Sequence, residues 1–389
     1  MTVLADRMAE IEPFHVMAIL ARARALEAQG RSIVHMEIGE PDFPTAVPIV
    51  EAGIAALRAG HTQYTPALGL PALRAAIAAS YPEAARPDPA RVLVTPGSSG
   101  ALTLVFGALI NPGDEVLMAD PGYPCNRHFV RLFEGRAMLV PVDASTSYQL
   151  TAALIRQHWT PATRAVLISS PSNPTGTLVP DADMAEIVRT VRELGGVLIV
   201  DEIYHGLTYG VPARSALHHS ADVFVVNSFS KYYGMTGWRV GWLVAPLGFV
   251  DAIDRLAQNI FLAASTPAQH AALAAFRPEV LAELGRRRDE FCTRRDYLLP
   301  ALRTLGFDIP ITPEGAFYLY AASSRLATAS DDFAQRLLEE AGVAITPGRD
   351  FGLHAPKRHV RISYANTQAQ LQEGVRRIAA FLGRPTPGI

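Results

Sequence analysis

Short apolar runs alternate with helix-like patterns through the middle of the chain. Seven such runs predict β-strands, at residues 91–95, 115–119, 137–142, 164–169, 197–200, 223–227 and 240–245. Several are apolar throughout rather than alternating, which is typical of strands covered on both faces. Helical periodicity occupies four further stretches, at residues 100–110, 181–194, 247–257 and 267–276. Together these patterns predict an α/β domain built on a buried, mostly parallel, seven-stranded sheet.

The two ends of the chain have a different pattern. Residues from about 10 to 30 form an Ala-rich amphipathic helix. Beyond residue 280 the pattern predicts a long charged helix, a strand at 316–321, a helix at 331–341, strands at 343–346 and 360–363, and a final helix. A chain of 389 residues is also long for one domain. We therefore expect a large domain over residues 46–280 and a smaller α+β domain formed by 1–45 and 281–389, with a binding site in the crevice between them.

The charge distribution does not alter this prediction of the fold and does not indicate nucleic-acid binding. The formal net charge is -2, which argues against a general binder of nucleic acid. The densest basic run combines Arg286, Arg287 and Arg288 with Arg294 and Arg295, and acidic residues are interleaved with it. This spacing favours the solvated face of a long helix over a nucleic-acid patch.

The cysteine count, the N-terminal segment and the length of the apolar runs bear on where the protein is located. Two cysteines, Cys125 and Cys292, are too few for a disulfide framework and are expected to be reduced. The N-terminus has no basic start followed by an apolar stretch, and no apolar run approaches membrane-spanning length. We expect a cytoplasmic protein that does not enter a membrane.

The first candidate for chemistry is a lysine that follows an apolar strand. Only Lys231 and Lys357 are lysines, and Lys231 lies next to Ser228 and Ser230, with Arg239 eight residues further on. A buried lysine near positive charge is kept neutral and can form a Schiff base with a carbonyl group. Hydroxyls and a guanidinium group suit a phosphate. The alternative, an ordinary surface lysine, does not account for this hydroxyl-rich turn.

Two further strand ends carry polar residues. Asp201 ends the apolar run 197–200, and Asn173 follows the run 164–169 in a proline-rich loop. A carboxylate at the ligand-facing edge of a sheet needs a cationic partner, and a protonated pyridine nitrogen is one. Taken alone, Asp201 is more simply a cap for the next helix, and Asn173 is part of a generic loop.

Two segments suggest anion binding. Residues 96–100 (Pro-Gly-Ser-Ser-Gly) join a strand to a helix, and the backbone amides of a helix start can cradle an anion, although a simple N-cap is as good an explanation. Arg361 lies in the apolar run 360–363 and needs an anionic partner, either a ligand carboxylate or a carboxylate of the protein. The Gly-x-Gly and P-loop signatures of nucleotide sites are missing, and we expect no metal site.

These signals together cover every part of a site for pyridoxal phosphate (PLP) and an amino acid. The chain resembles the class I/II aminotransferases, which are fold-type I PLP enzymes that include aspartate aminotransferase. The likeness extends from residue 37 to Arg361 and is most specific in segments 37–43, 64–69, 201–204 and 230–239. It implies an enzyme that moves an amino group between an amino acid and a 2-oxo acid by ping-pong kinetics.

The resemblance also implies catalytic roles. Lys231 would form the imine with PLP and then move the Cα proton. Asp201 would pair with the pyridine nitrogen and keep the ring an electron sink. Asn173 and Tyr204 would hydrogen-bond the phenolic oxygen, and Tyr123 would stack on the ring.

The remaining implied roles concern binding. The resemblance assigns the phosphate to Ser98, Ser99, Ser228, Ser230 and Arg239. It adds Tyr64 from the second subunit of a homodimer. Gly39, Asn173 and Arg361 would receive the substrate carboxylate.

Proteins with other functions have the same residues at these positions. A fold-type I carbon–sulfur β-lyase and an aspartate aminotransferase are the enzymatic alternatives, and an effector-binding module of a transcription regulator is the remote non-enzymatic one. The loop at 97–100 carries no lysine for a second substrate carboxylate, and no arginine stands out near the site. We therefore expect a neutral donor, with Phe14, Phe261 and Phe317 as candidate pocket walls.

Overall fold

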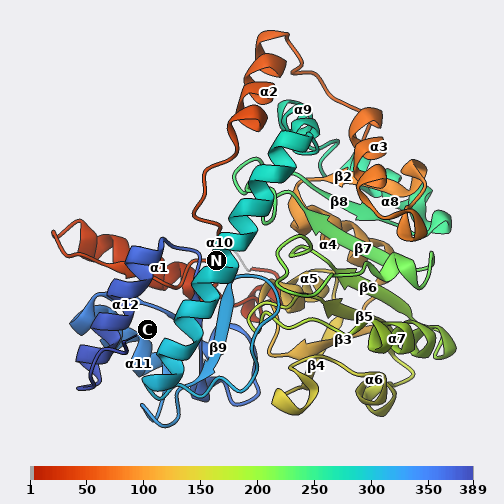
Figure 1. The fold of residues 1–389 in the computed structure, drawn as a ribbon. Coiled ribbons are helices and arrows are strands. Elements are labelled where there is room, and N and C mark those ends of the chain that lie inside the picture. The colour runs from red at the N-terminus through yellow and green to blue at the C-terminus, as the bar shows by residue number, and fades with distance from the viewer. Residues whose placement is uncertain (1–3, 389) are drawn as a thin grey trace.

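The computed structural model describes residues 4–388, and the larger sheet is the core of the part on the right in Figure 1. Its strand order is β2-β8-β7-β6-β5-β3-β4, and β8 alone runs antiparallel to its neighbours. The strands are β2 (Val92–Thr95), β3 (Glu115–Asp120), β4 (Arg136–Pro141), β5 (Thr163–Ser169), β6 (Val197–Asp201), β7 (Phe224–Ser228) and β8 (Gly241–Val244). The prediction of a mostly parallel seven-stranded sheet is confirmed.

Helices cover both faces of this sheet. On one face α4 (Gly97–Leu109), α5 (Cys125–Leu132) and α8 (Val250–Ile260) pack against alternate strand residues such as Ala165 and Leu167. On the other face α3 (Pro71–Ser80), α6 (Ala152–His158) and α7 (Asp181–Glu193) pack against Val166 and Ile168. The helix α2 (Val47–Arg58) lies along α9 (Thr266–Ala274) at one end of the sheet (Figure 1). Burial on both faces explains why the strand sequences are apolar throughout.

A second, smaller α+β unit contains both ends of the chain. Its antiparallel sheet has the order β11-β12-β9, and a parallel pair joins β1 to β10. The strands are β1 (Val34–His35), β9 (Tyr318–Ala322), β10 (Val343–Ala344), β11 (Thr346–Pro347) and β12 (His359–Ser363). The helices are α1 (His15–Glu27), α11 (Ser330–Arg336), α12 (Gln368–Phe381) and part of α10 (Pro278–Thr304), which runs from α9 to this unit (Figure 1). The N-terminal segment folds onto this unit as expected, and the boundaries at 46 and 280 stay predictions.

Several elements differ from the expectations. The run 343–346 is not one strand, because β10 and β11 belong to different sheets. The helix expected at 331–341 ends at Arg336 and continues as a π-helical turn over Leu337–Ala341. The first helix is shorter than expected, because residues 11–14 are not helical and the helix spans only His15–Glu27. No helix in the described part of the chain is long and apolar enough to cross a bilayer.

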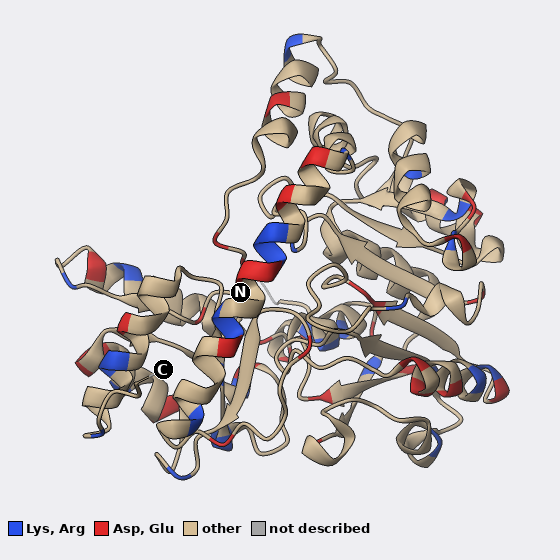
Figure 2. Cartoon of the chain, viewed as in Figure 1, with Lys and Arg blue, Asp and Glu red and all other residues tan. Residues whose placement is uncertain are grey.

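The expectation of a solvated arginine face on α10 is wrong in part. Acidic and basic residues do alternate along this helix (Figure 2). However, Arg294 is buried and forms an ion pair with Asp42 at 2.7 Å. Arg287 donates to the backbone oxygen of Pro44 at 2.7 Å. These arginines therefore fasten the segment around residues 42–44 to α10.

Candidate active site

A cavity of about 470 Å³ lies where the larger sheet meets the smaller unit. Its floor is formed by the carboxyl ends of β5 and β6, the turn after β7 and the start of α4. Binding at the carboxyl ends of the strands is the usual arrangement in open α/β sheets. Eleven of the predicted site residues line it: Gly39, Ser98, Ser99, Tyr123, Asn173, Asp201, Tyr204, Ser230, Lys231, Arg239 and Arg361.

Lys231 projects into this cavity directly after β7. Its Nζ donates a hydrogen bond to the backbone oxygen of Gly39 at 2.5 Å. Burial and the positive charge of Arg361 lower the pKa of Lys231 from 10.5 to about 8. A tenth or so of the amine is therefore neutral at pH 7, as a lysine that attacks a carbonyl requires.

Asp201 lies at the end of β6 with little to balance its charge. Its Oδ1 accepts a hydrogen bond from the backbone nitrogen of Ile203 at 3.1 Å. Within residues 4–388 no basic side chain lies at ion-pair distance from it. Burial raises the pKa of Asp201 to about 7. A cation bound beside it would lower that pKa and remove the cost of burial.

Arg361 lies on β12, on the opposite side of the cavity, and is buried. Its Nη1 donates to Oδ1 of Asn173 at 3.0 Å, and its Nη2 donates to the backbone oxygen of Glu37 at 2.5 Å. Its Nε has no partner among the described residues. No protein carboxylate of the described chain pairs with it, so a ligand carboxylate is the better of the two explanations left open by the sequence.

Gly39 leaves room beside this guanidinium group. A Cβ atom at position 39 would lie 2.8 Å from the hydroxyl of Tyr318 and 3.8 Å from Nη1 of Arg361. Any larger residue would fill the space in which a carboxylate can approach Arg361.

The start of α4 forms an anion-binding cradle with Arg239. Ser98 and Ser99 occupy the first turn, and no side chain caps this helix. The guanidinium group of Arg239 lies so close that a Cβ atom on Gly97 would be 2.5 Å from Nη2. Nη1 of Arg239 also donates to Oγ of Ser230 at 3.4 Å. Free backbone amides, hydroxyls and a guanidinium group at a helix N-terminus are the usual surroundings of a bound phosphate.

Two predicted phosphate ligands do not lie on the cavity wall. Ser228 is buried behind Ser230, to which its Oγ donates at 3.0 Å, so it orients Ser230 in this structure. Tyr64 is 82% exposed and does not line the cavity of its own chain. This exposure leaves Tyr64 free to contact another molecule.

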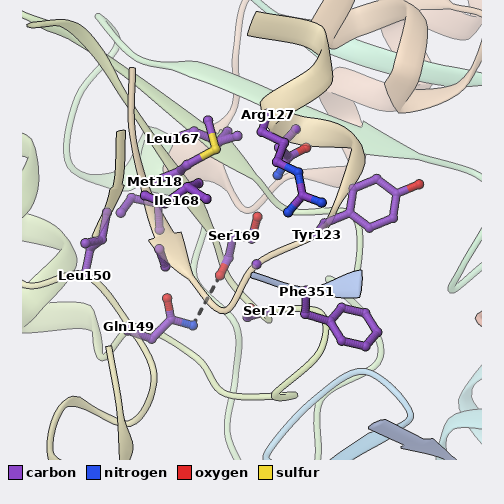
Figure 3. Close-up of a pocket in the computed structure, with 14 residues that line it drawn as sticks. Met118, Tyr123, Arg127, Gln149, Leu150, Leu167, Ile168, Ser169, Ser172 and Phe351 are labelled. Carbon is purple, nitrogen blue, oxygen red and sulfur yellow. Dashed lines mark hydrogen bonds between the residues drawn. The ribbon is translucent and has the colours of Figure 1, made fainter. Parts of the chain in front are cut away.

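A much smaller cavity lies behind Tyr123 (Figure 3). Its volume of about 30 Å³ suits one or two water molecules but no amino acid. Gln149 closes it from below and donates to the backbone oxygen of Ser169 at 3.2 Å. Gln149 therefore helps to hold the end of β5, from which the loop that contains Asn173 extends.

Comparison with known proteins identifies the family. Residues 31–378 match the family described as aminotransferase class I and II. The chain is 38% identical to the valine–pyruvate aminotransferase of Mycobacterium tuberculosis, over 97% of this chain and 99% of that protein. It is 34% identical to the aspartate aminotransferase of Geobacillus stearothermophilus, over 97% and 98%. The crystal structure of an aminotransferase from Mycobacterium tuberculosis superimposes with a TM-score of 0.95, at 38% identity, over 98% of this chain and all of that one.

The chain belongs to the class I/II aminotransferases. It is a fold-type I PLP-dependent transferase of amino-acid metabolism, and its substrates are an amino acid and a 2-oxo acid. The site fits this cofactor, because the cradle at α4 suits a phosphate and Asp201 lacks the cation that a protonated pyridine nitrogen supplies.

The aminotransferase cavity contains wall residues that the sequence did not reveal. Tyr318, on β9, accepts or donates a hydrogen bond with Tyr204 at 3.0 Å and lies beneath Arg361. Glu37 contributes a fully buried carboxylate, which His35 contacts at 2.7 Å. The α1 helix adds a further wall formed by Val16, Met17, Leu20 and Arg24. No local signal indicates these positions, because they reach the site through the packing of distant segments.

The predicted aromatic walls are found in part. Phe14 lines the cavity, with its ring 6.3 Å from that of Tyr123 in an edge-to-face arrangement. Phe317 is fully buried behind Tyr204 and does not line the cavity. Phe261 packs on the large sheet near α8, away from the site of its own chain. The expectation that no arginine besides the recognised ones lies near the site is wrong, because Arg24 is on the wall.

Proposed function

We propose that this aminotransferase takes a neutral L-amino acid as its preferred donor, rather than aspartate. The observation that carries the proposal is the apolar wall beside Tyr123, which is formed by Phe14, Val16, Met17 and Leu20. Such a wall stabilises apolar side chains, whereas a short acidic side chain would lose its hydration there without gaining a partner. Relatives that act on valine and on aspartate are both similar to the chain, so family membership alone does not decide the donor.

The proposed roles follow from the position of each side chain. Arg361 and Asn173, beside Gly39, bind the α-carboxylate and orient the Cα–H bond. Lys231, neutral in part because of its lowered pKa, takes up the Cα proton and returns it from the same side of the site, where its amine lies. PLP, when bound, delocalises the electron pair left by that proton.

Other residues hold the cofactor in this proposal. Asp201 keeps the ring nitrogen protonated, Tyr204 and Asn173 donate to the phenolic oxygen, and Tyr123 stacks on the ring. The phosphate is bound by Ser98, Ser99, Ser230 and Arg239, with Ser228 behind Ser230.

A panel of amino-acid donors tests the donor preference. Alanine, valine, leucine, phenylalanine and aspartate are assayed with 2-oxoglutarate and with pyruvate, and kcat/KM is compared. We expect at least one neutral donor to exceed aspartate by about tenfold or more. A value for aspartate above that of every neutral donor would instead favour the aspartate aminotransferase alternative. Release of ammonia and pyruvate from cystathionine without an oxo acid would favour the β-lyase.

The proposal includes a homodimer with shared sites. Tyr64 is exposed on a segment that would reach the phosphate of the second subunit. A Lys231→Ala protein is mixed with a Tyr64→Ala protein, and the mixed dimer should regain one complete site. Fully active monomers at low concentration would contradict shared sites.

We also propose that the chain divides into a large domain over residues 46–280 and a small domain formed by 1–45 and 281–389. The proposed location of the enzyme is the cytoplasm.

A further inference from the structure

A buried carboxylate at the end of β3 binds a loop of the smaller unit. This loop, residues 350–354, follows β11. Oδ2 of Asp120 accepts hydrogen bonds from the backbone nitrogens of Leu353 at 2.8 Å and His354 at 3.0 Å. Hydrogen bonds to a charged group are among the stronger ones in proteins. Asp120 therefore fastens the 350–354 loop to the larger sheet, although 233 positions separate it from Leu353.

The 350–354 loop has a glycine where it passes this carboxylate. A Cβ atom on Gly352 would overlap the carboxyl group of Asp120, and the three atoms nearest to it would all belong to that group. Oδ1 of Asp120 is buried in this contact and has no hydrogen-bond partner among the described residues. A methyl group at position 352 and a carboxylate at position 120 therefore cannot occupy this space together.

Phe351, in the same loop, contacts both sides of the active site. Its backbone oxygen accepts a hydrogen bond from the nitrogen of Gly122, next to Tyr123, at 2.8 Å. Phe351 and Tyr123 both line the small cavity behind Tyr123 (Figure 3). The buried ring of Phe351 lies 4.9 Å from the guanidinium carbon of Arg361, and such a contact between a cation and an aromatic face is stabilising. The position of Phe351 therefore affects Tyr123 and Arg361 together.

We propose that Asp120 is a positioning residue of the active site, because it fixes Phe351 and thereby sets Arg361 in register with Tyr123. The inference rests on the proposed function of the site, in which Tyr123 stacks on the cofactor ring and Arg361 binds the α-carboxylate. Every amino acid and 2-oxo acid carries that carboxylate. Asp120 therefore influences all substrates alike, whatever their side chains.

Binding of 4-methylpentanoate to the holoenzyme tests the inference without turnover. This acid has the carboxylate but no amino group, and its Kd is followed through the cofactor absorbance. Asp120→Ala should raise the Kd about tenfold, the factor for loss of one hydrogen bond to a charged group. Asp120→Asn, whose amide oxygen still accepts, should raise it less. In steady-state assays of Asp120→Ala, kcat/KM for alanine, valine and 2-oxoglutarate should fall by a common factor, with KM changing more than kcat.

A double-mutant cycle tests whether Asp120 and Gly352 act as one contact. Gly352→Ala should raise the Kd about as much as Asp120→Ala, because the added methyl group displaces the carboxylate. The double variant should be no worse than either single variant, because the methyl group then occupies the space that the carboxyl group has left. Hydrogen exchange of the Gly122 amide should become faster in all three proteins, since its acceptor in the loop is no longer held.

Asp114→Ala is the matched control at the other end of β3, where Oδ2 of Asp114 accepts from the backbone nitrogen of Asn111 at 2.8 Å. It should leave the Kd unchanged. An unchanged Kd in Asp120→Ala, or a rise in the double variant equal to the product of the two single rises, would overturn the inference alone. Arg361→Lys tests the proposed function separately, because lysine cannot offer the same fork to a carboxylate. If Arg361→Lys left the Kd unchanged, the proposed role of Arg361 would fail and the inference with it.

Discussion

The start of α1 is capped by a side chain from the other end of the chain. Oδ1 of Asp350 accepts from the backbone nitrogen of His15 at 2.9 Å, and Oδ2 accepts from that of Val16 at 2.8 Å. Phe14, at the capping position itself, offers no side-chain hydrogen bond. Because α1 carries the apolar wall of the active site, Asp350 holds that wall in place.

Replacing Asp350 with alanine would leave both backbone donors without a partner. Loss of an N-cap costs about 0.5–2 kcal/mol, and hydrogen bonds to a charged group are at the upper end of such values. Burial of the carboxylate, which raises the pKa of Asp350, opposes part of this stabilisation. We therefore expect α1 to dock about 1–2 kcal/mol less favourably, which corresponds to about a 5- to 30-fold rise in KM for neutral donors.

Steady-state kinetics and limited trypsin digestion check this expectation together. Asp350→Ala should raise KM more than it lowers kcat, and cleavage after Arg22 or Arg24 should become faster. Asp88→Ala is the matched control, because Asp88 caps a short surface helix through the nitrogen of Ala90 at 2.8 Å. If KM and the rate of N-terminal cleavage changed no more in Asp350→Ala than in the control, the role of Asp350 as a cap for the wall would be refuted.

Further predictions concern the floor of the site. Borohydride reduction of the holoenzyme should attach PLP at Lys231 alone, as found by peptide mass spectrometry, and Lys231→Ala should abolish transamination; label on Lys357 would refute the assignment. Asp201→Ala should lower kcat by about a hundredfold or more, since stabilisation of developing charge is a large catalytic term, and a near-normal rate would remove Asp201 from the mechanism. Because burial lowers the pKa of Lys231 to about 8 and only the neutral amine reacts, the rate of PLP capture by apoenzyme should rise about tenfold per pH unit up to about pH 8 and then level off. A midpoint near the ordinary lysine value of 10.5 would contradict this.

Sequence reasoning was most successful where the chemistry follows a buried strand. Asp201 and Lys231 come directly at or after runs of β-branched and aliphatic residues, and such runs are visible without any knowledge of the fold. Helices such as α5 and α6 were not predicted, because eight or seven residues give too little periodicity. Two-residue strands such as β1 carry almost no local signal either.

Contacts between distant segments could not be predicted. Arg294 looks like a surface residue in its own charged helix, yet Asp42, 252 positions away, makes it part of the interior. Arg24 belongs to an amphipathic helix that the sequence did predict. Only the docking of that helix over the crevice, through Asp350, turns one of its faces toward the active site.

The hydrogen bond between Arg361 and Asn173 joins positions 188 residues apart and has a consequence for synthesis of the chain. The strands that carry Asp201 and Lys231, and the cradle at α4, have all been synthesised once β8 is complete at Val244. β12 pairs with β9 and β11 and follows more than a hundred residues later. A nascent chain would therefore acquire the means to hold a phosphate and a carbonyl well before it can select an amino acid by its carboxylate. Discrimination among substrates by their carboxylate would therefore be the last property of the enzyme to form.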